Sequence, residues 1–270
     1  MKALVIKALD AIIPDSTQQV ALTERQVYVF DVRSLIATFQ KDAKLSGNIY
    51  PNIISPSSAQ TYLNNENPAG YPTLKNNSND GWYLDFTSAN NILCFIRSNI
   101  FADTSAHKLE PTLVVAKFKL TNYDDPNLID WTAGSVPLTS RILNTGSASL
   151  SGNASVRFIQ LKNGILFCCG SNYSKPIVLN KTTNWVTIAY YSSSATSESK
   201  YIESSNPIFK EASKAGFLTE NIDAISMNNQ PYGGVTPPTT CPLQLKYFGI
   251  YRGTFSDTEI KAIYDYVNSL

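Results

Sequence analysis

Short segments in which every second residue is large and apolar constrain the fold of this chain more than any other feature. Trp82, Leu84 and Phe86 occupy alternate positions, which places their side chains on one face of a β-strand. A later segment repeats the pattern, with Lys117 and Lys119 pointing outward. We therefore expect half-buried antiparallel strands at residues 82–86, 114–120, 156–161, 165–169, 185–191 and 243–251.

One pair of these segments predicts a β-hairpin. The apolar runs 156–161 and 165–169 are separated by a short polar link that contains Asn163 and Gly164. An Asn-Gly pair tolerates the positive φ angles of a type I′ turn, which joins antiparallel strands. We predict a hairpin with this turn.

Helical spacing is clear near residue 260. Ser256 and Glu259 form a capping-box pattern, and Phe255 can pack on Ile260 across the helix start. Apolar residues then recur at helical spacing, which predicts a short amphipathic helix over about 257–268 that packs on a sheet. A second, weaker helical pattern covers residues 34–43.

Composition excludes several classes of chemistry. The chain of 270 residues has one histidine, so it cannot form an HExxH zinc site or a centre of three histidines. It also lacks a phosphate-binding P-loop and a G-x-S-x-G nucleophile elbow. With 22 basic and 21 acidic residues, the formal charge is only +1, which gives no basic field for nucleic acid or an anionic membrane.

The cysteines and the N-terminal residues bear on the compartment. The four cysteines form no C-x-x-C pair, and three of them sit in apolar runs, so we expect reduced thiols. Lys7 and Asp10 interrupt the apolar stretch at the N-terminus, which argues against a signal peptide. No run approaches the roughly 20 apolar residues of a membrane span.

Four spaced motifs carry a resemblance to a known family. They are Tyr71–Leu74 with Asp80–Phe86, Pro111–Phe118, Asn184–Tyr190, and Lys246–Ile260. With these motifs the chain resembles the laminin-G-like, concanavalin A-like jelly rolls of phage and prophage surface proteins and of many bacterial secreted proteins. The likeness covers residues 25–270.

The resemblance implies an all-β fold, a concanavalin A-like antiparallel β-sandwich (jelly roll) with a short C-terminal helix. Residues 25–270 would form this sandwich domain, and residues 1–24 a separate N-terminal segment. That segment is either the first edge strand of the sandwich or an attachment strand, because Lys2–Leu9 resembles the opening of some tail-fibre proteins. Trp82 and Trp185 lie on strand patterns and are expected in the core.

The resemblance does not fix function, since this fold hosts lectins, glycosidases and virion proteins alike. The catalytic relatives carry a Glu-x-Asp-x-(x)-Glu strand that this chain lacks, and its nearest pair, Glu198 and Glu203, reads as a solvated strand edge. We therefore expect a non-enzymatic bacteriophage virion protein, a capsid decoration or tail-fibre component for host adhesion. The alternative is an extracellular carbohydrate-binding module or glycosidase of a bacterium, and a structural spacer without ligand is a third reading.

The virion hypothesis also implies particular partners and a location for the protein. Other virion proteins and a host surface glycan are the expected partners, nucleic acid and membrane are not, and a homo-oligomer is expected. The protein would assemble in the host cytoplasm and end on the virion surface. No cofactor is expected, because the Asp-rich calcium loop of many laminin-G-like lectins is not evident.

One loop gathers the residue types that bind sugars. An aromatic ring can cover the apolar face of a pyranose, while carboxylates bond its hydroxyls. The loop 121–131 holds the candidates Tyr123, Asp124, Asp125, Asp130 and Trp131. Its aspartates could instead bind a hard cation or form turns around Pro126, and Trp131 could plug the core.

Overall fold

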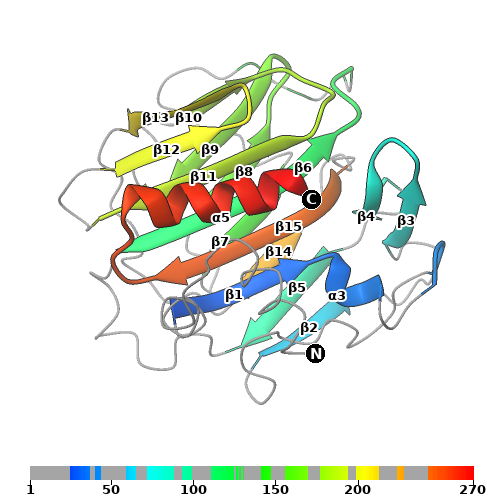
Figure 1. Ribbon diagram of the computed structural model, residues 1–270. Helices are drawn as coiled ribbons and strands as arrows, with labels where there is room; N and C mark the ends of the chain where they lie inside the picture. The colour runs from blue at the N-terminus through cyan, green and yellow to red at the C-terminus, as the bar shows by residue number, and fades with distance from the viewer. Residues whose placement is uncertain are drawn as a thin grey trace.

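The computed structural model describes a two-layer β-sandwich with one long helix on its outside (Figure 1). All its strand pairs are antiparallel. The structure describes residues 25–36, 40–43, 59–64, 72–87, 93–98, 111–124, 126, 128, 130, 141–146, 156–169, 177–193, 199–212, 224–227 and 243–270. The expected fold class, a jelly-roll sandwich with a C-terminal helix, is confirmed.

The first sheet has eight strands in the order β13-β12-β11-β6-β15-β4-β3, with β1 also pairing with β15. Their bounds are β1 Gln26–Asp31, β3 Thr73–Asn77, β4 Gly81–Asp85, β6 Thr112–Leu120, β11 Val186–Ser192, β12 Ser199–Glu203, β13 Asn206–Ala212 and β15 Leu243–Arg252. We call it sheet A.

The second sheet, sheet B, has seven strands in the order β10-β9-β8-β7-β14-β5-β2. Their bounds are β2 Ala59–Asn64, β5 Leu93–Ser98, β7 Arg141–Gly146, β8 Val156–Gln160, β9 Gly164–Cys169, β10 Ile177–Asn180 and β14 Ala224–Met227. The strands expected from alternation correspond to β4, β6, β8, β9, β11 and β15, and all six are present.

The main core lies between the two sheets. It is built around aromatic rings, with Phe158 of sheet B 5.3 Å from Phe118 and 4.7 Å from Phe167 between ring centroids. Tyr190 joins from β11, 4.9 Å from Phe167. Leu84 and Phe86 also belong to this core, and Trp82 packs against it. The predicted facing of β4 is therefore confirmed.

Helix α5 (Asp257–Ser269) covers the outer face of sheet A, across β6 and β11 (Figure 1). The predicted capping box is present, since the Ser256 side chain accepts from the Glu259 backbone N–H and the Glu259 side chain accepts from the Ser256 backbone. Ile260, Ile263 and Val267 are buried in a second apolar cluster between helix and sheet. The outer face of sheet A is thus buried where α5 lies.

The weaker helical pattern over 34–43 corresponds to a much shorter element. Helix α3 spans only Arg33–Ile36. Gln40–Ala43 forms a turn in which Asp42 has a φ of 65°, a conformation that no α-helix contains. The predicted longer helix is wrong over 40–43. The N-terminal segment 1–24 lies outside the described residues.

Candidate functional site

The hairpin between β3 and β4 positions the central carboxylate of the candidate site. Asn77 pairs with Gly81 across the turn, and Gly81 has the positive φ of 65° that glycine adopts without strain. The Asn77 Oδ1 atom accepts hydrogen bonds from the backbone N–H groups of Asn79 at 2.9 Å and Asp80 at 2.7 Å. This side-chain-capped turn fixes the position of Asp80.

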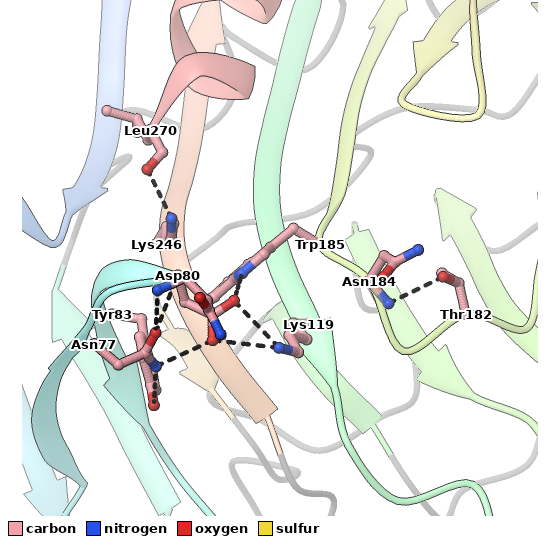
Figure 2. Close-up of polar contacts among 10 residues, drawn as sticks. Asn77, Asp80, Tyr83, Lys119, Thr182, Asn184, Trp185, Lys246 and Leu270 are labelled. Atoms are coloured by element: carbon pink, nitrogen blue, oxygen red, sulfur yellow. Dashed lines mark hydrogen bonds and ion pairs between the residues drawn. The ribbon is translucent and has the colours of Figure 1, made fainter.

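The Asp80 carboxylate joins three elements of sheet A (Figure 2). It accepts hydrogen bonds from Trp185 Nε1 at 2.7 Å, from Asn77 Nδ2 at 3.1 Å and from Lys119 Nζ at 3.2 Å. Burial alone would raise the pKa of Asp80, but these hydrogen bonds outweigh it and hold the pKa below its usual value. Asp80 is therefore a charged anchor whose acceptor capacity is used within the protein.

Trp185 lies on the outer face of sheet A rather than in the core. Its ring meets Tyr83 edge-on, with centroids 5.9 Å apart and an interplanar angle of 63°. The ammonium groups of Lys246 and Lys119 lie 4.6 Å and 5.8 Å from the ring centroid, within cation–π range. The side chain stays partly exposed. The expectation that Trp185 is a core residue is wrong.

A β-bulge brings Lys246 to this face. Leu245 pairs with Phe118 and Tyr247 with Lys117, so Lys246 is the extra residue between them. Leu245 points into the main core and Tyr247 into the cluster under α5. Lys246 thereby reaches the tryptophan ring from β15.

Two lysines of the sheet bind the C-terminal end of α5. Lys117 Nζ donates to the Asn268 carbonyl at 2.6 Å, and Lys246 Nζ donates to the main-chain oxygen of Leu270, the last residue of the sequence, at 2.7 Å (Figure 2 shows the second bond). The last turn of α5 carries no basic residue, so these two cations supply the favourable charge at that end of the helix dipole.

Burial affects the charge of both lysines. Lys117 is 7% exposed and Lys246 4% exposed. Burial, followed by the charge of Lys246, lowers the pKa of Lys117 to about 8. Burial also lowers the pKa of Lys246, partly opposed by the charge of Asp80. Lys117, placed outward by the sequence pattern, is thus on the outer face as predicted but covered by the end of α5.

We call Asn77, Asp80, Tyr83, Lys119, Trp185 and Lys246 the outer-face cluster. It combines a partly exposed indole with ammonium and amide donors, and Asp80 holds the donors in place. The β3–β4 turn and the residues just before β11 also carry exposed polar side chains, namely Asn79, Thr183 and Asn184. Such a surface can stack on an apolar ligand face and hydrogen-bond the ligand's rim.

The sequence contained a usable signal for the part of the cluster that lies on the β3–β4 hairpin. Asp80-Gly81 before an aromatic strand indicates a tight turn that presents an aspartate. The partners Lys119, Trp185 and Lys246 are remote in sequence, and only the strand order β11-β6-β15-β4 brings them to Asp80. Sequence reasoning therefore missed the cluster.

The residues of the loop predicted to bind sugars differ in their burial. Tyr123 is 4% exposed and belongs to the main core, where its ring offers little surface to a ligand. Asp124 is almost fully exposed, with its carboxylate 3.9 Å from Lys181 Nζ, and Asp130 is exposed. Asp125 and Trp131 lie outside the described residues. Binding at Asp124, Asp125, Asp130 and Trp131 stays a prediction.

Glu203 is not the solvated residue that its sequence indicated. It is 5% exposed, accepts hydrogen bonds from Ser205 Oγ at 2.7 Å, and pairs with Lys210 at 3.3 Å. These contacts close the β12–β13 turn. The carboxylate serves local structure, and Glu198 lies outside the described residues.

The described part of the chain contains neither a membrane-spanning helix nor a cluster of metal-ligating side chains. No helix there is long and apolar enough to span a membrane. Within the same residues, no three side chains of His, Cys, Asp or Glu come together as a metal site would require.

Comparison with known proteins identifies a fold but no family. No family model and no curated protein sequence matches the chain significantly. Solved structures of botulinum neurotoxin binding domains do match. The binding domain of botulinum neurotoxin DC, in complex with rat synaptotagmin II, has a TM-score of 0.54 and 10% identity, covering 91% of this chain and 52% of that one.

Two further solved structures show a similar likeness to the chain. A receptor-binding domain has a TM-score of 0.55 and 10% identity, covering 92% of this chain and 52% of that one. A structure of botulinum neurotoxin type C, whose cell entry depends on two ganglioside molecules, has a TM-score of 0.53 and 9% identity, with 92% and 52% covered. The chain spans about half the length of these domains. At this identity the likeness shows a shared β-sandwich fold.

Proposed function

We propose that the chain is a non-enzymatic binding module that takes a carbohydrate at the outer-face cluster. One observation carries this proposal: a partly exposed tryptophan is anchored by Asp80 among ammonium and amide donors. Trp185 would cover the apolar face of a sugar ring, and Lys119 would bond its oxygens. Asp80 would act as a positioning residue. The glycan-related neurotoxin structures share the fold and are compatible with this role.

The same contacts favour binding over hydrolysis. Glycoside hydrolysis needs two carboxyl groups about 5–9.5 Å apart that are available to the substrate. Glu203 is occupied by Ser205 and Lys210, and Asp80 is occupied by Trp185 and its neighbours. An extracellular glycosidase, the alternative raised by the sequence, therefore has no support from these two groups.

A glycan array with the purified chain tests the proposal. We expect hits that are lost in Trp185→Ala and kept in Trp131→Ala, measured with and without calcium. The reverse pattern would move the site to the predicted loop of Asp124, Asp125, Asp130 and Trp131. An array without hits would contradict carbohydrate binding and favour a structural role. Circular dichroism of each variant checks that the sandwich is intact.

We further propose that this module belongs to a bacteriophage particle, as a capsid decoration or tail-fibre component that assembles in the host cytoplasm. The motifs shared with phage surface jelly rolls support it. An antibody against the chain should label sedimented particles from a producing culture, and light scattering of the purified protein should give a multimeric mass. Label confined to the cell envelope or to soluble culture medium would contradict the virion role.

A further inference from the structure

Lys119 is the ammonium group of the outer-face cluster that is most open to a ligand. Its side chain is 22% exposed. Lys246 is 4% exposed and Lys117 7%, and both already donate to main-chain oxygens at the end of α5. The charge of Lys119 therefore decides how the surface beside Trp185 meets a charged ligand.

Asp80 neutralises that charge. Lys119 Nζ lies 3.2 Å from one carboxylate oxygen of Asp80 and 3.4 Å from the other. The Asp80 side chain is 18% exposed, and its hydrogen bonds hold its pKa below the usual value, so it stays ionised at neutral pH. An acidic group brought to Lys119 would therefore meet a like charge beside it, which disfavours its binding.

Uncharged polar side chains are exposed beside this ion pair along the chain. Asn79 precedes Asp80 in the β3–β4 turn, and Thr183 and Asn184 precede Trp185. Amide and hydroxyl groups both donate and accept hydrogen bonds, as sugar hydroxyls do, whereas a carboxylate or sulfate only accepts them. These side chains therefore suit hydroxyl groups better than a concentrated negative charge.

From these contacts we infer that Asp80 is a specificity-determining residue, which neutralises Lys119 and so makes the outer-face cluster select uncharged saccharides over acidic ones. This inference rests on the proposed function and names its ligand class. The same carboxylate also positions the indole, through the 2.7 Å hydrogen bond from Trp185 Nε1. Asp80 thus adds a repulsive element against acidic ligands to the attractive contacts of the site.

Matched ligand pairs test the inference by calorimetric titration of the whole chain. Dextran and dextran sulfate share a backbone and differ in charge, as do the full methyl ester of oligogalacturonate and oligogalacturonate itself. The wild-type protein should bind the neutral member of a pair at least as tightly as the acidic member. Its affinity for the neutral member should be the same at about 0.1 M and about 1 M salt, although the screening length falls from about 10 Å to about 3 Å.

Asp80→Asn should shift the preference toward acidic ligands. The asparagine Oδ1 atom can still accept from Trp185 Nε1, but the charge of Lys119 is no longer neutralised. We expect about tenfold tighter binding of at least one acidic ligand, since hydrogen bonds to charged groups are the stronger ones. The double variant that adds Lys119→Gln should lose this gain.

A second ion pair provides the matched control. Lys75 Nζ, on β3, lies 2.6 Å from Asp42, and their side chains are 37% and 54% exposed. Asp42→Asn changes the net charge of the protein by the same amount as Asp80→Asn, but it frees Lys75 instead of Lys119. It should leave the affinities for both members of each ligand pair unchanged.

The possible failures are distinguishable. Tighter binding of the acidic member by the wild-type protein, lost in Trp185→Ala, would overturn the role of Asp80 and keep the proposed function. An equal gain of acidic binding in Asp80→Asn and Asp42→Asn would be an effect of net charge and would also overturn it. No gain in Asp80→Asn, with the variant folded by circular dichroism, would overturn the inference, and the glycan array then decides the proposed function separately.

Discussion

At the scale of single residues, Trp185 shows where alternation fails. Val186, Ile188 and Tyr190 point into the main core, so Trp185 shares the opposite face with Thr187 and Ala189. Helix α5 buries much of that face too, and a strand buried on both faces reads as a continuous apolar run. The sequence predicted the strand but could not say which face was the core.

The buried Lys117 predicts that the stability of the protein depends on pH. Its pKa is about 8 in the folded protein and about 10.4 in an unfolded chain, so between these values the unfolded state binds more protons. The free energy of unfolding should therefore rise with pH from about 8 toward 10. Above about pH 10 the trend reverses. Burial raises the pKa of Tyr264 to about 12, so the folded state then binds more protons than the unfolded state.

The variant Lys117→Met isolates this effect. Urea denaturation of both proteins at pH values from about 7 to about 9.5 should show the wild-type gaining stability relative to the variant as pH rises. The cost of burying the charge is present at neutral pH and is relieved as Lys117 loses its proton. Parallel stability curves for the two proteins would contradict the burial of a charged Lys117.

At the scale of elements, the β8–β9 hairpin was predicted correctly but for an incomplete reason. Neither Asn163 nor Gly164 has a positive φ, so the type I′ turn that the Asn-Gly pair indicated is absent. Gln160 instead pairs with Ile165, and Leu161 N–H donates to the Gly164 carbonyl at 2.9 Å. A Cβ on Gly164 would lie 2.2 Å from the Leu179 carbonyl oxygen of β10. The glycine is needed for close strand approach, which local sequence cannot reveal.

Gly164→Ala tests this explanation. Without the clash, alanine in ordinary backbone would stabilise the protein by about 0.4–1 kcal/mol through the unfolded state. With it, β10 must move, and we expect a loss of roughly 1–3 kcal/mol in the free energy of unfolding. Lys162→Ala, an exposed neighbour in the same turn, should change stability by less than about 0.5 kcal/mol. A stabilising Gly164→Ala would disprove the close approach.

At the scale of the whole molecule, sequence and structure agree on the sandwich and on α5. Six strands and the helix carried enough apolar alternation, turn signal and capping pattern to be recognised. Short or polar strands such as β3 (TLKNN) and β10 (IVLN) did not. Their place depends on pairing with β4 and β9 rather than on their own residues.

The candidate site depends on the same long-range order. Lys119 and Lys246 lie on β6 and β15, Asp80 lies in the turn just before β4, and Trp185 immediately precedes β11. They meet only because sheet A places β11, β6, β15 and β4 side by side. The sequence instead favoured loop 121–131, where suitable residue types are neighbours along the chain. Tyr123 of that loop fills the core, because apolar surface is buried wherever the fold allows it.

The most direct test of glycan binding at the outer-face cluster follows the indole N–H signals of the chain by nuclear magnetic resonance. The chain has three tryptophans, so their three signals can be assigned with single Trp→Phe variants. On titration with a saccharide selected by the array, the Trp185 signal should shift, since its N–H bonds Asp80 at 2.7 Å, while the Trp82 signal stays in place. A shift confined to Trp131, or no shift in any indole signal, would contradict the account.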